Sequence, residues 1–231
     1  MLTERPMDQQ ILSLCMPGVN VSVVSASQRA ESCLYPEEKK ILTASATRKR
    51  TGEFTMGRTA ARNALAQFGI TRFPVLKGRR REPIWPSGYV GSITHKTNMA
   101  VAAVAGERQY SSIGIDLEHT SEDIPFEMFK KICVPAEIEW AKQFEALKPV
   151  RLMMLFSAKE SIYKALNLKY VSRIGFQDVQ LNWVDKIQAF TVDFLNGLEK
   201  RLDRLHHPLT VTCLASGRSI FTCLAIENHD A

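Results

Sequence analysis

The run Ser112-Ile113-Gly114-Ile115-Asp116-Leu117-Glu118 alternates apolar residues with small or acidic ones, which is the pattern of a β-strand. Successive side chains of a strand point to opposite faces of its sheet, so the three apolar residues share one face. Asp116 and Glu118 then lie together on the other face. A pair of this kind is also typical of the solvated face of a half-buried sheet, so the rest of the chain has to decide what the two acids do.

A second acidic motif, Phe156-Ser157-Ala158-Lys159-Glu160-Ser161-Ile162-Tyr163-Lys164, has the periodicity of a helix. Glu160 and Lys164 are four residues apart and project from one side of this helix. The opposite stripe is apolar and consists of Leu155, Ala158, Ile162, Ala165 and Leu166. An acid followed by a lysine at this spacing is also the commonest ion pair of a helix surface, so the motif alone has two interpretations.

Together the two motifs supply three carboxylates, Asp116, Glu118 and Glu160, and one nearby cation, Lys164. Magnesium prefers a few carboxylate oxygens together with phosphate and water. Phosphoryl-type transfer also needs cations that hold the charged oxygens of the substrate. The combination therefore predicts a magnesium site for phosphate chemistry.

Composition sets the frame for this prediction. The chain has 231 residues and 45% hydrophobic content, enough to bury a core in one large domain or two compact halves. Its net charge of +6 indicates an acidic or phosphate-bearing partner. Nucleic acid would fit the charge equally well, but we find no aromatic RNA-binding motif, no zinc-finger spacing and no long basic run.

The five cysteines include no Cys-x-x-Cys pair and are odd in number, which is typical of free thiols in a reducing compartment. The N-terminal region lacks the apolar core of a signal peptide. No stretch approaches the roughly 20 apolar residues that span a membrane. We therefore expect a cytoplasmic protein without a membrane span.

Local signals predict the remaining elements. Pro36-Glu37-Glu38 is typical of a helix start, and this helix is expected to end in the basic cluster Arg48-Lys49-Arg50. An amphipathic helix is expected at 54–68, followed by a basic loop at 74–89. Further helices are expected near 124–132, 135–147 and 150–168, and strands at 19–24, 176–183, 188–194, 209–215 and 219–226.

Three short strands are expected in the middle of the chain, at 89–95, 99–105 and 111–118. Short turns separate them, which favours an antiparallel meander. In such a meander His95 would lie in the same sheet region as Asp116 and Glu118.

Six ordered blocks of sequence resemble a known family. They are Arg48-Lys49-Arg50 through Glu53-Phe54, Gly57-Arg58 with Ala61-Arg62, Arg80 through Pro86, Gly91-Ser92-Ile93-Thr94-His95, Gly114 through Glu118, and Phe156 through Lys164. In this order they resemble the 4'-phosphopantetheinyl transferases, in the Sfp-like branch and its enterobactin-synthase component D subgroup. The resemblance runs from about residue 35 to residue 168 and leaves the first 30 and last 60 residues without a motif.

This resemblance implies both an activity and a fold. Members transfer the phosphopantetheine arm of coenzyme A to a serine of an apo carrier protein, with release of 3',5'-ADP. The implied fold is α+β, with two similar halves related by a pseudo-two-fold and coenzyme A in the cleft between them. On this basis residues 1–114 would bind the adenosine and phosphates, and residues 115–231 would carry the magnesium site and the catalytic helix. Two halves in one chain imply that a monomer suffices.

The resemblance also implies roles for single residues. Asp116, Glu118 and Glu160 would bind magnesium, with manganese as the alternative ion. Lys164 and His95 would hold the pyrophosphate, although a lone histidine is about as often structural. The clamp on the 3'-phosphate and the other phosphates of coenzyme A is expected from Arg50, Arg58 and one or two of Arg79, Arg80 and Arg81. Further contacts to coenzyme A are expected from Ser92 and Thr94. The base that accepts the serine proton is either Glu160 or a metal-held water.

For other residues the expectation is plainer. Lys49 and Arg62 are expected on a solvated basic surface. Met128, Phe129 and Ile132 are candidates for docking an acidic carrier protein, by position alone. The resemblance leaves the pathway of the carrier open among fatty-acid, polyketide, nonribosomal-peptide and siderophore assembly.

Two other classes of function compete with the transferase. The same three acids would suit another magnesium-dependent enzyme, such as a phosphohydrolase or a nuclease. A basic, non-enzymatic binding module would use the acids only as surface groups. The order of the motifs favours the transferase.

Overall fold

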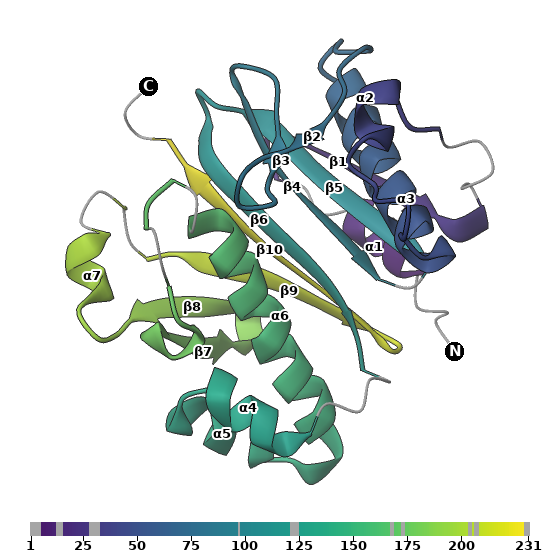
Figure 1. Cartoon of the computed structure of the whole chain (residues 1–231). Coiled ribbons are helices and arrows are strands. Elements are labelled where there is room, and N and C mark those ends of the chain that lie inside the picture. The colour runs from purple at the N-terminus through teal and green to yellow at the C-terminus, as the bar shows by residue number, and fades with distance from the viewer. Residues whose placement is uncertain are drawn as a thin grey trace. The chain divides into compact units, whose positions relative to one another are not determined.

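The computed structural model describes residues 6–12, 16–27, 33–96, 98–120, 125–166, 169–171, 174–202, 205 and 208–228. Apart from the short chain ends, the chain divides into two compact units, residues 5–113 and residues 114–226. We call them the N-terminal unit and the C-terminal unit. Figure 1 draws the first in purple to teal and the second in teal to yellow.

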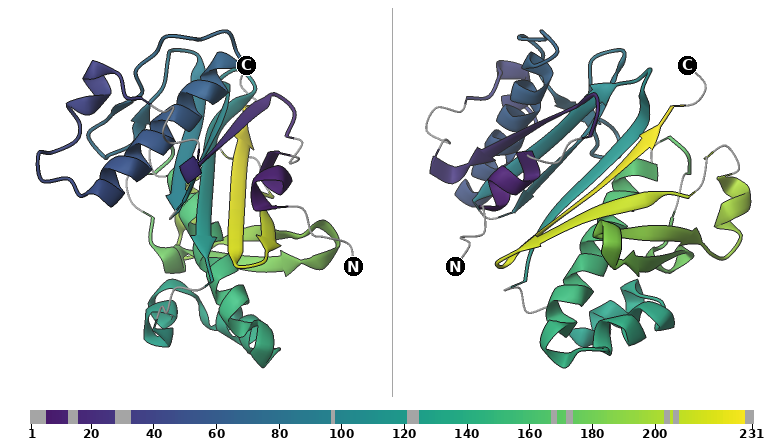
Figure 2. Two further views of the ribbon diagram at one scale, coloured as in Figure 1. Left: turned by 90° about the vertical axis from the view of Figure 1, so that its right-hand side faces the viewer. Right: turned by 180° about the vertical axis from the view of Figure 1, so that it is seen from behind.

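The N-terminal unit is a three-stranded antiparallel sheet, in the order β1-β5-β4, with a long helix on one face (Figure 2). Its elements are α1 (Met7–Leu12), β1 (Val19–Ser25), α2 (Pro36–Lys39), α3 (Arg48–Ala66), β2 (Leu76–Lys77), β3 (Pro83–Ile84), β4 (Tyr89–Lys96) and β5 (Met99–Gly106). Small residues line the helix–sheet contact: Ala60, Ala61 and Ala64 of α3 face Ala100 and Ala102 of β5. This close packing fixes the side chains of α3 against β4 and β5.

The C-terminal unit is built on a five-stranded sheet in the order β6-β10-β9-β8-β7. Its elements are β6 (Tyr110–His119), α4 (Phe126–Ile132), α5 (Pro135–Lys142), η2 (Glu145–Leu147), α6 (Lys148–Leu166), η3 (Phe176–Asp178), β7 (Val179–Val184), η4 (Asp185–Ile187), β8 (Ala189–Phe194), α7 (Leu198–Arg201), β9 (Thr210–Ser216) and β10 (Ser219–Glu227). Helix α6 packs on this sheet, with Leu155, Ala158 and Ile162 in a core shared with Phe190 and Val211 (Figure 1).

These elements confirm the predicted α+β class, and the strands and helices expected after residue 124 are present with shifted ends. Among the described residues, none of the helices combines the length and the apolar character needed to cross a membrane.

The predicted helix from Pro36 into the basic cluster is wrong. Helix α2 ends at Lys39, and Arg48 instead begins α3. The reason is a helix cap that the prediction overlooked: the side chain of Thr47 accepts a hydrogen bond from Arg50 N at 3.1 Å. As a result, Arg50 and Arg58 belong to the same helix.

The predicted meander is right in its first half, because β4 and β5 pair antiparallel, and wrong in its third strand, β6. Both edges of β5 are occupied, one by β1 and the other by β4, so β6 has no place beside it. β6 instead pairs with β10, from the far end of the sequence. His95 on β4 and the two acids of β6 therefore belong to different sheets.

Candidate active site

Strand β6 and helix α6 meet at Gly114. A Cβ atom at this position would overlap the carbonyl oxygen of Ser161 and lie 2.7 Å from the nitrogen of Ala165, so only glycine permits the observed approach. Since alternate residues of a strand share a face, Asp116 and Glu118 lie on the face of β6 that Gly114 presents to the helix. The predicted alternation is thus what brings these acids to α6.

Asp116 is the best-anchored acid of the site and is only 5% exposed. Ser157 Oγ donates a hydrogen bond to Asp116 Oδ2 at 3.0 Å. Lys164 Nζ donates to Asp116 Oδ1 at 2.7 Å and to the carbonyl of Ile115 at 2.9 Å. Lys164 therefore forms its ion pair with Asp116 of β6. The alternative interpretation, a surface ion pair with Glu160 on the same helix, does not account for this contact.

Glu160 carries the electrostatic signature of the site. Burial raises the pKa of its carboxyl above the ordinary value, the negative charge of Asp116 raises it further, Lys164 opposes the shift, and Glu118 adds to it. The three predicted acids are therefore close enough to repel one another. Glu118 has other interactions, but its buried Oε2 accepts no hydrogen bond from the described residues.

Such a set of like charges favours a bound cation. Among the described residues, however, no three acid, histidine or cysteine side chains are arranged so that they could hold a metal ion as they stand. Lys164 supplies part of the missing positive charge, since its ammonium group lies against Asp116.

In the N-terminal unit, a second cluster joins α3 to β4. Arg50 Nη1 lies 3.3 Å from His95 Nε2, and His95 Nδ1 lies 3.8 Å from Glu53 Oε2. A guanidinium group can only donate, so His95 Nε2 accepts in this contact. The structure thus brings together Arg50 and His95, two of the residues predicted to contact coenzyme A.

Ser92 and Thr94 are buried and alternate with His95 along β4. Successive residues of a strand point to opposite faces, so Ser92 and Thr94 share one face of the sheet and His95, which directly follows Thr94, lies on the other. The expected grouping of all three around one ligand does not follow from this strand geometry.

Arg58, one of the predicted phosphate ligands, is a buried cation on α3, with 7% exposure. Its guanidinium carbon lies 4.5 Å from the centre of the Phe54 ring, and its buried Nε has no hydrogen-bond partner among the described residues. Burial lowers the pKa of Arg58 to about 10; Glu38 opposes this shift, and the charges of Arg50 and Arg62 add to it. A buried cation of this kind is suited to an anionic ligand.

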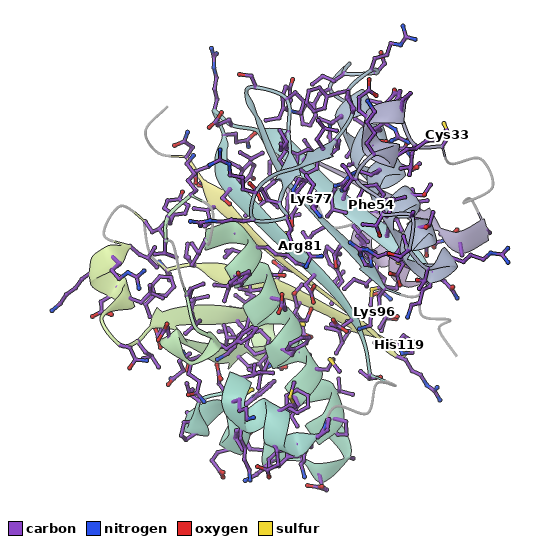
Figure 3. All side chains as sticks on the ribbon, viewed as in Figure 1. Cys33, Phe54, Lys77, Arg81, Lys96 and His119 are labelled. Atoms are coloured by element: carbon purple, nitrogen blue, oxygen red, sulfur yellow. The ribbon has the colours of Figure 1, made fainter. Side chains whose placement is uncertain are left out.

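The other arginines differ from Arg58. Arg62 forms an ion pair with the buried Glu38 and is largely covered, so its expected place on a solvated surface is wrong. Lys49 does lie on that surface. Arg79, Arg80 and Arg81 are exposed in the turn between β2 and β3, where Figure 3 labels Lys77 and Arg81.

Comparison with known proteins bears on both units. The model of the 4'-phosphopantetheinyl transferase N-terminal domain matches residues 37–105, and that of the 4'-phosphopantetheinyl transferase superfamily matches residues 112–213. The 4'-phosphopantetheinyl transferase Npt of Nocardia iowensis is 37% identical over 177 residues, which cover 74% of this chain and 78% of that protein. The chain belongs to the 4'-phosphopantetheinyl transferase family.

Two further relatives agree. The 4'-phosphopantetheinyl transferase Svp of Streptomyces mobaraensis is 41% identical over 166 residues, covering 71% of this chain and 67% of that protein. Enterobactin synthase component D of Salmonella typhi is 35% identical over 138 residues, covering 59% of this chain and 56% of that protein.

As a 4'-phosphopantetheinyl transferase, the chain is an enzyme that transfers the phosphopantetheine arm of coenzyme A to a carrier protein. The comparisons support neither the phosphohydrolase or nuclease nor the non-enzymatic binding module. The roles of the single site residues stay predictions.

Two of the three residues predicted to dock the carrier protein do not lie on the surface. Phe129 and Ile132, expected to dock the carrier, are buried in the core of the C-terminal unit. Met128 alone of the three is exposed, at 49%. The sequence motifs also gave no role to Ser157 or to Thr222 of β10, although both lie in the polar cluster around Asp116.

Proposed function

We propose that Asp116, Glu118 and Glu160 of this transferase hold a divalent cation, magnesium or manganese, against the pyrophosphate of coenzyme A. The observation that carries the proposal is the close approach of β6 to α6 at Gly114, which sets Asp116 against Lys164 and leaves Oε2 of Glu118 buried without a hydrogen bond from the described residues. The raised pKa of Glu160, caused by burial and by Asp116 and Glu118, agrees with this arrangement. Oxygen ligands of this kind suit a hard cation. When bound, the cation offsets the charge that develops on the phosphate oxygens.

The chain's own cations would then handle the rest of the phosphate charge. Lys164, which lies against Asp116, would donate to the pyrophosphate or to the departing phosphate. Arg58 is the strongest candidate for the 3'-phosphate, because its guanidinium is buried and its Nε lacks a hydrogen-bond partner among the described residues. Arg50 and His95 would bind neighbouring phosphate oxygens, with Arg79, Arg80, Arg81, Ser92 and Thr94 as further candidate contacts.

The serine of the carrier must lose its proton as it attacks the phosphate. Glu160 is suited to accept it, because a carboxylate with a raised pKa is a better base than an ordinary one. The other route, through a water held by the metal, uses the same three acids. An acidic carrier protein, whether an acyl, peptidyl or aryl carrier, fits the net charge of +6.

We propose the same division of labour between the halves as the resemblance implies: residues 1–114 for the adenosine and phosphates, and residues 115–231 for the metal and the catalytic helix. One copy of the chain would suffice, because both sets of candidate residues lie in one sequence. The free cysteines Cys33, Cys133, Cys213 and Cys223 support a place in the reducing cytoplasm.

The direct test is intact mass spectrometry of an apo carrier protein after incubation with the enzyme, coenzyme A and magnesium. We expect the carrier to gain one phosphopantetheine arm, and we expect EDTA to abolish the gain. A gain that persists in EDTA would contradict the metal site. A panel of acyl, peptidyl and aryl carriers, each with a no-enzyme control, would identify the class of carrier.

A further inference from the structure

A chain of buried hydroxyl groups on α6 and β10 leads to Asp116 of the neighbouring strand β6. Ser157 and Ser161 of α6 and Thr222 of β10 have no exposed surface. Thr222 Oγ1 lies 2.9 Å from Ser157 Oγ and 2.7 Å from Ser161 Oγ. Ser157 Oγ lies 3.0 Å from Asp116 Oδ2. Three hydroxyls from two elements thus form one connected path that ends on a candidate metal ligand.

Counting protons fixes the direction of this path. An ionised carboxylate only accepts, so the single proton of Ser157 must point to Asp116. Ser157 Oγ must then accept from Thr222, and Thr222 Oγ1 must in turn accept from Ser161. The proton of Ser161 also reaches the carbonyl of Thr222, at 3.1 Å, so that it is shared between two acceptors of one residue. Every hydroxyl therefore donates toward Asp116.

We infer that Ser157 and Thr222 are positioning residues, which hold the carboxylate of Asp116 in the orientation that a divalent cation needs. The inference rests on the proposed role of Asp116 as a metal ligand. Hydrogen bonds from a second layer of residues commonly orient metal-binding carboxylates in this way.

The geometry around Asp116 explains how the orientation is kept. Ser157 holds Oδ2, while Lys164 holds Oδ1 at 2.7 Å. Donors on both oxygens fix the rotation of the carboxylate plane.

Thr222 is the most informative residue to change, because its hydroxyl contacts Ser157 and Ser161 and reaches Asp116 through Ser157. Thr222→Val keeps the shape of the side chain and removes the hydroxyl, whereas Thr222→Ser keeps the hydroxyl. Thr212→Val is a matched control, because Thr212 lies on the neighbouring strand β9, opposite Cys223, and outside the path.

The test measures binding of Mn²⁺ to the full chain, with and without saturating coenzyme A, by electron paramagnetic resonance of the unbound ion. We expect Thr222→Val to weaken Mn²⁺ binding about tenfold, the lower end of what loss of such a supporting residue costs. Thr222→Ser and Thr212→Val should bind like the parent enzyme. Should Thr222→Val not fold, Ser157→Ala takes its place with the same expectation.

Two results overturn the inference in distinguishable ways. Unchanged Mn²⁺ affinity in Thr222→Val or Ser157→Ala, with a lower melting temperature, would leave the path a purely structural feature. Asp116→Asn is the reference variant. If Asp116→Asn also binds Mn²⁺ like the parent enzyme, the proposed metal site itself is wrong.

Discussion

Helix α6 carries two lysines of one sequence motif in opposite circumstances. Lys159 is 1% exposed and lies 2.8 Å from the equally buried Glu137, and it also donates to the carbonyls of Ile132, Phe176 and Val179. Lys164 is 29% exposed and has two acceptors among the described residues, Asp116 and the carbonyl of Ile115. An ammonium group has three donors, so Lys159 is saturated and Lys164 is not.

The difference separates a structural charge from a functional one. Lys159 ties α6 to residues of α4, α5, η3 and β7, and all of its partners belong to the protein. Lys164 sits beside repelling carboxylates at the more open side of the helix, where a ligand can change its partner. Hence the Lys159 pair should govern stability, and the Lys164 side should govern activity.

Removing an acid on the Lys164 side should have the largest effect. We expect Asp116→Ala and Glu160→Ala each to lower the rate of carrier modification by about 10²–10⁴-fold, because a lost metal ligand costs several kcal/mol of transition-state stabilisation. The rate is measured by mass spectrometry, with circular dichroism as the control for folding. If both variants modified the carrier at the parent rate, we would abandon the site.

Removing Lys159, the buried cation of α6, should instead destabilise the fold. Lys159→Met leaves Glu137 buried without its counter-charge, and such a loss typically costs about 3–5 kcal/mol. Urea unfolding measures the effect. The double variant Lys159→Met/Glu137→Leu should recover much of the lost stability, and Lys164→Met should lose little. Equal stability of Lys159→Met and the parent protein would refute the contrast.

The sequence predicted the acids of this comparison but not their supports. Alternation in β6 and the helical spacing of α6 place Asp116, Glu118 and Glu160 correctly, because both patterns are local. Thr222 supports Asp116 from β10, more than 100 residues away in sequence, and no local pattern marks a single threonine in an ordinary strand. The burial of Lys159 could not be predicted from the sequence either, since a lysine in a helix is usually solvated.

The misplaced elements have the same physical origin. Strand β6 follows β5 after a short turn, so local rules favour pairing between them. The structure instead fills both edges of β5 with β1 and β4, which is a long-range preference of the packed sheet. Phe129 and Ile132 belong to a core whose other members come from distant parts of the sequence, so the local sequence does not predict their burial.

A buried cation in the N-terminal unit extends the comparison. Arg58 resembles Lys159 in its burial, but its Nε has no hydrogen-bond partner among the described residues. We expect Arg58→Ala to raise the KM for coenzyme A about tenfold, as for a lost charged hydrogen bond, and to change the KM for dephospho-coenzyme A much less. Steady-state kinetics with the two substrates, and with Lys49→Ala as an exposed control, measure this. Equal losses on both substrates would remove Arg58 from the 3'-phosphate.

The smallest expected effect concerns Glu160 in the ligand-free protein, and it has a definite sign. The folded protein raises the pKa of Glu160 above its unfolded value of about 4.5, so ionisation of this group opposes folding as the pH rises through the folded pKa. Glu160→Gln removes the charge. In EDTA at pH 8 the variant should therefore be more stable than the parent, by about 2–4 °C in Tm for each 1 kcal/mol gained.

The gain should shrink as the pH falls from the folded pKa and vanish below 4.5, where Glu160 is protonated in both folded and unfolded states. Magnesium with coenzyme A should reverse the order at pH 8, because ligand that binds only the folded parent enzyme stabilises it by mass action. Thermal melts across pH, with and without the ligands, measure both effects. If Glu160→Gln were less stable than the parent in EDTA, the acids beside Lys164 would be stabilised by favourable contacts, as Lys159 is. The contrast between the two sides of α6 would then be wrong.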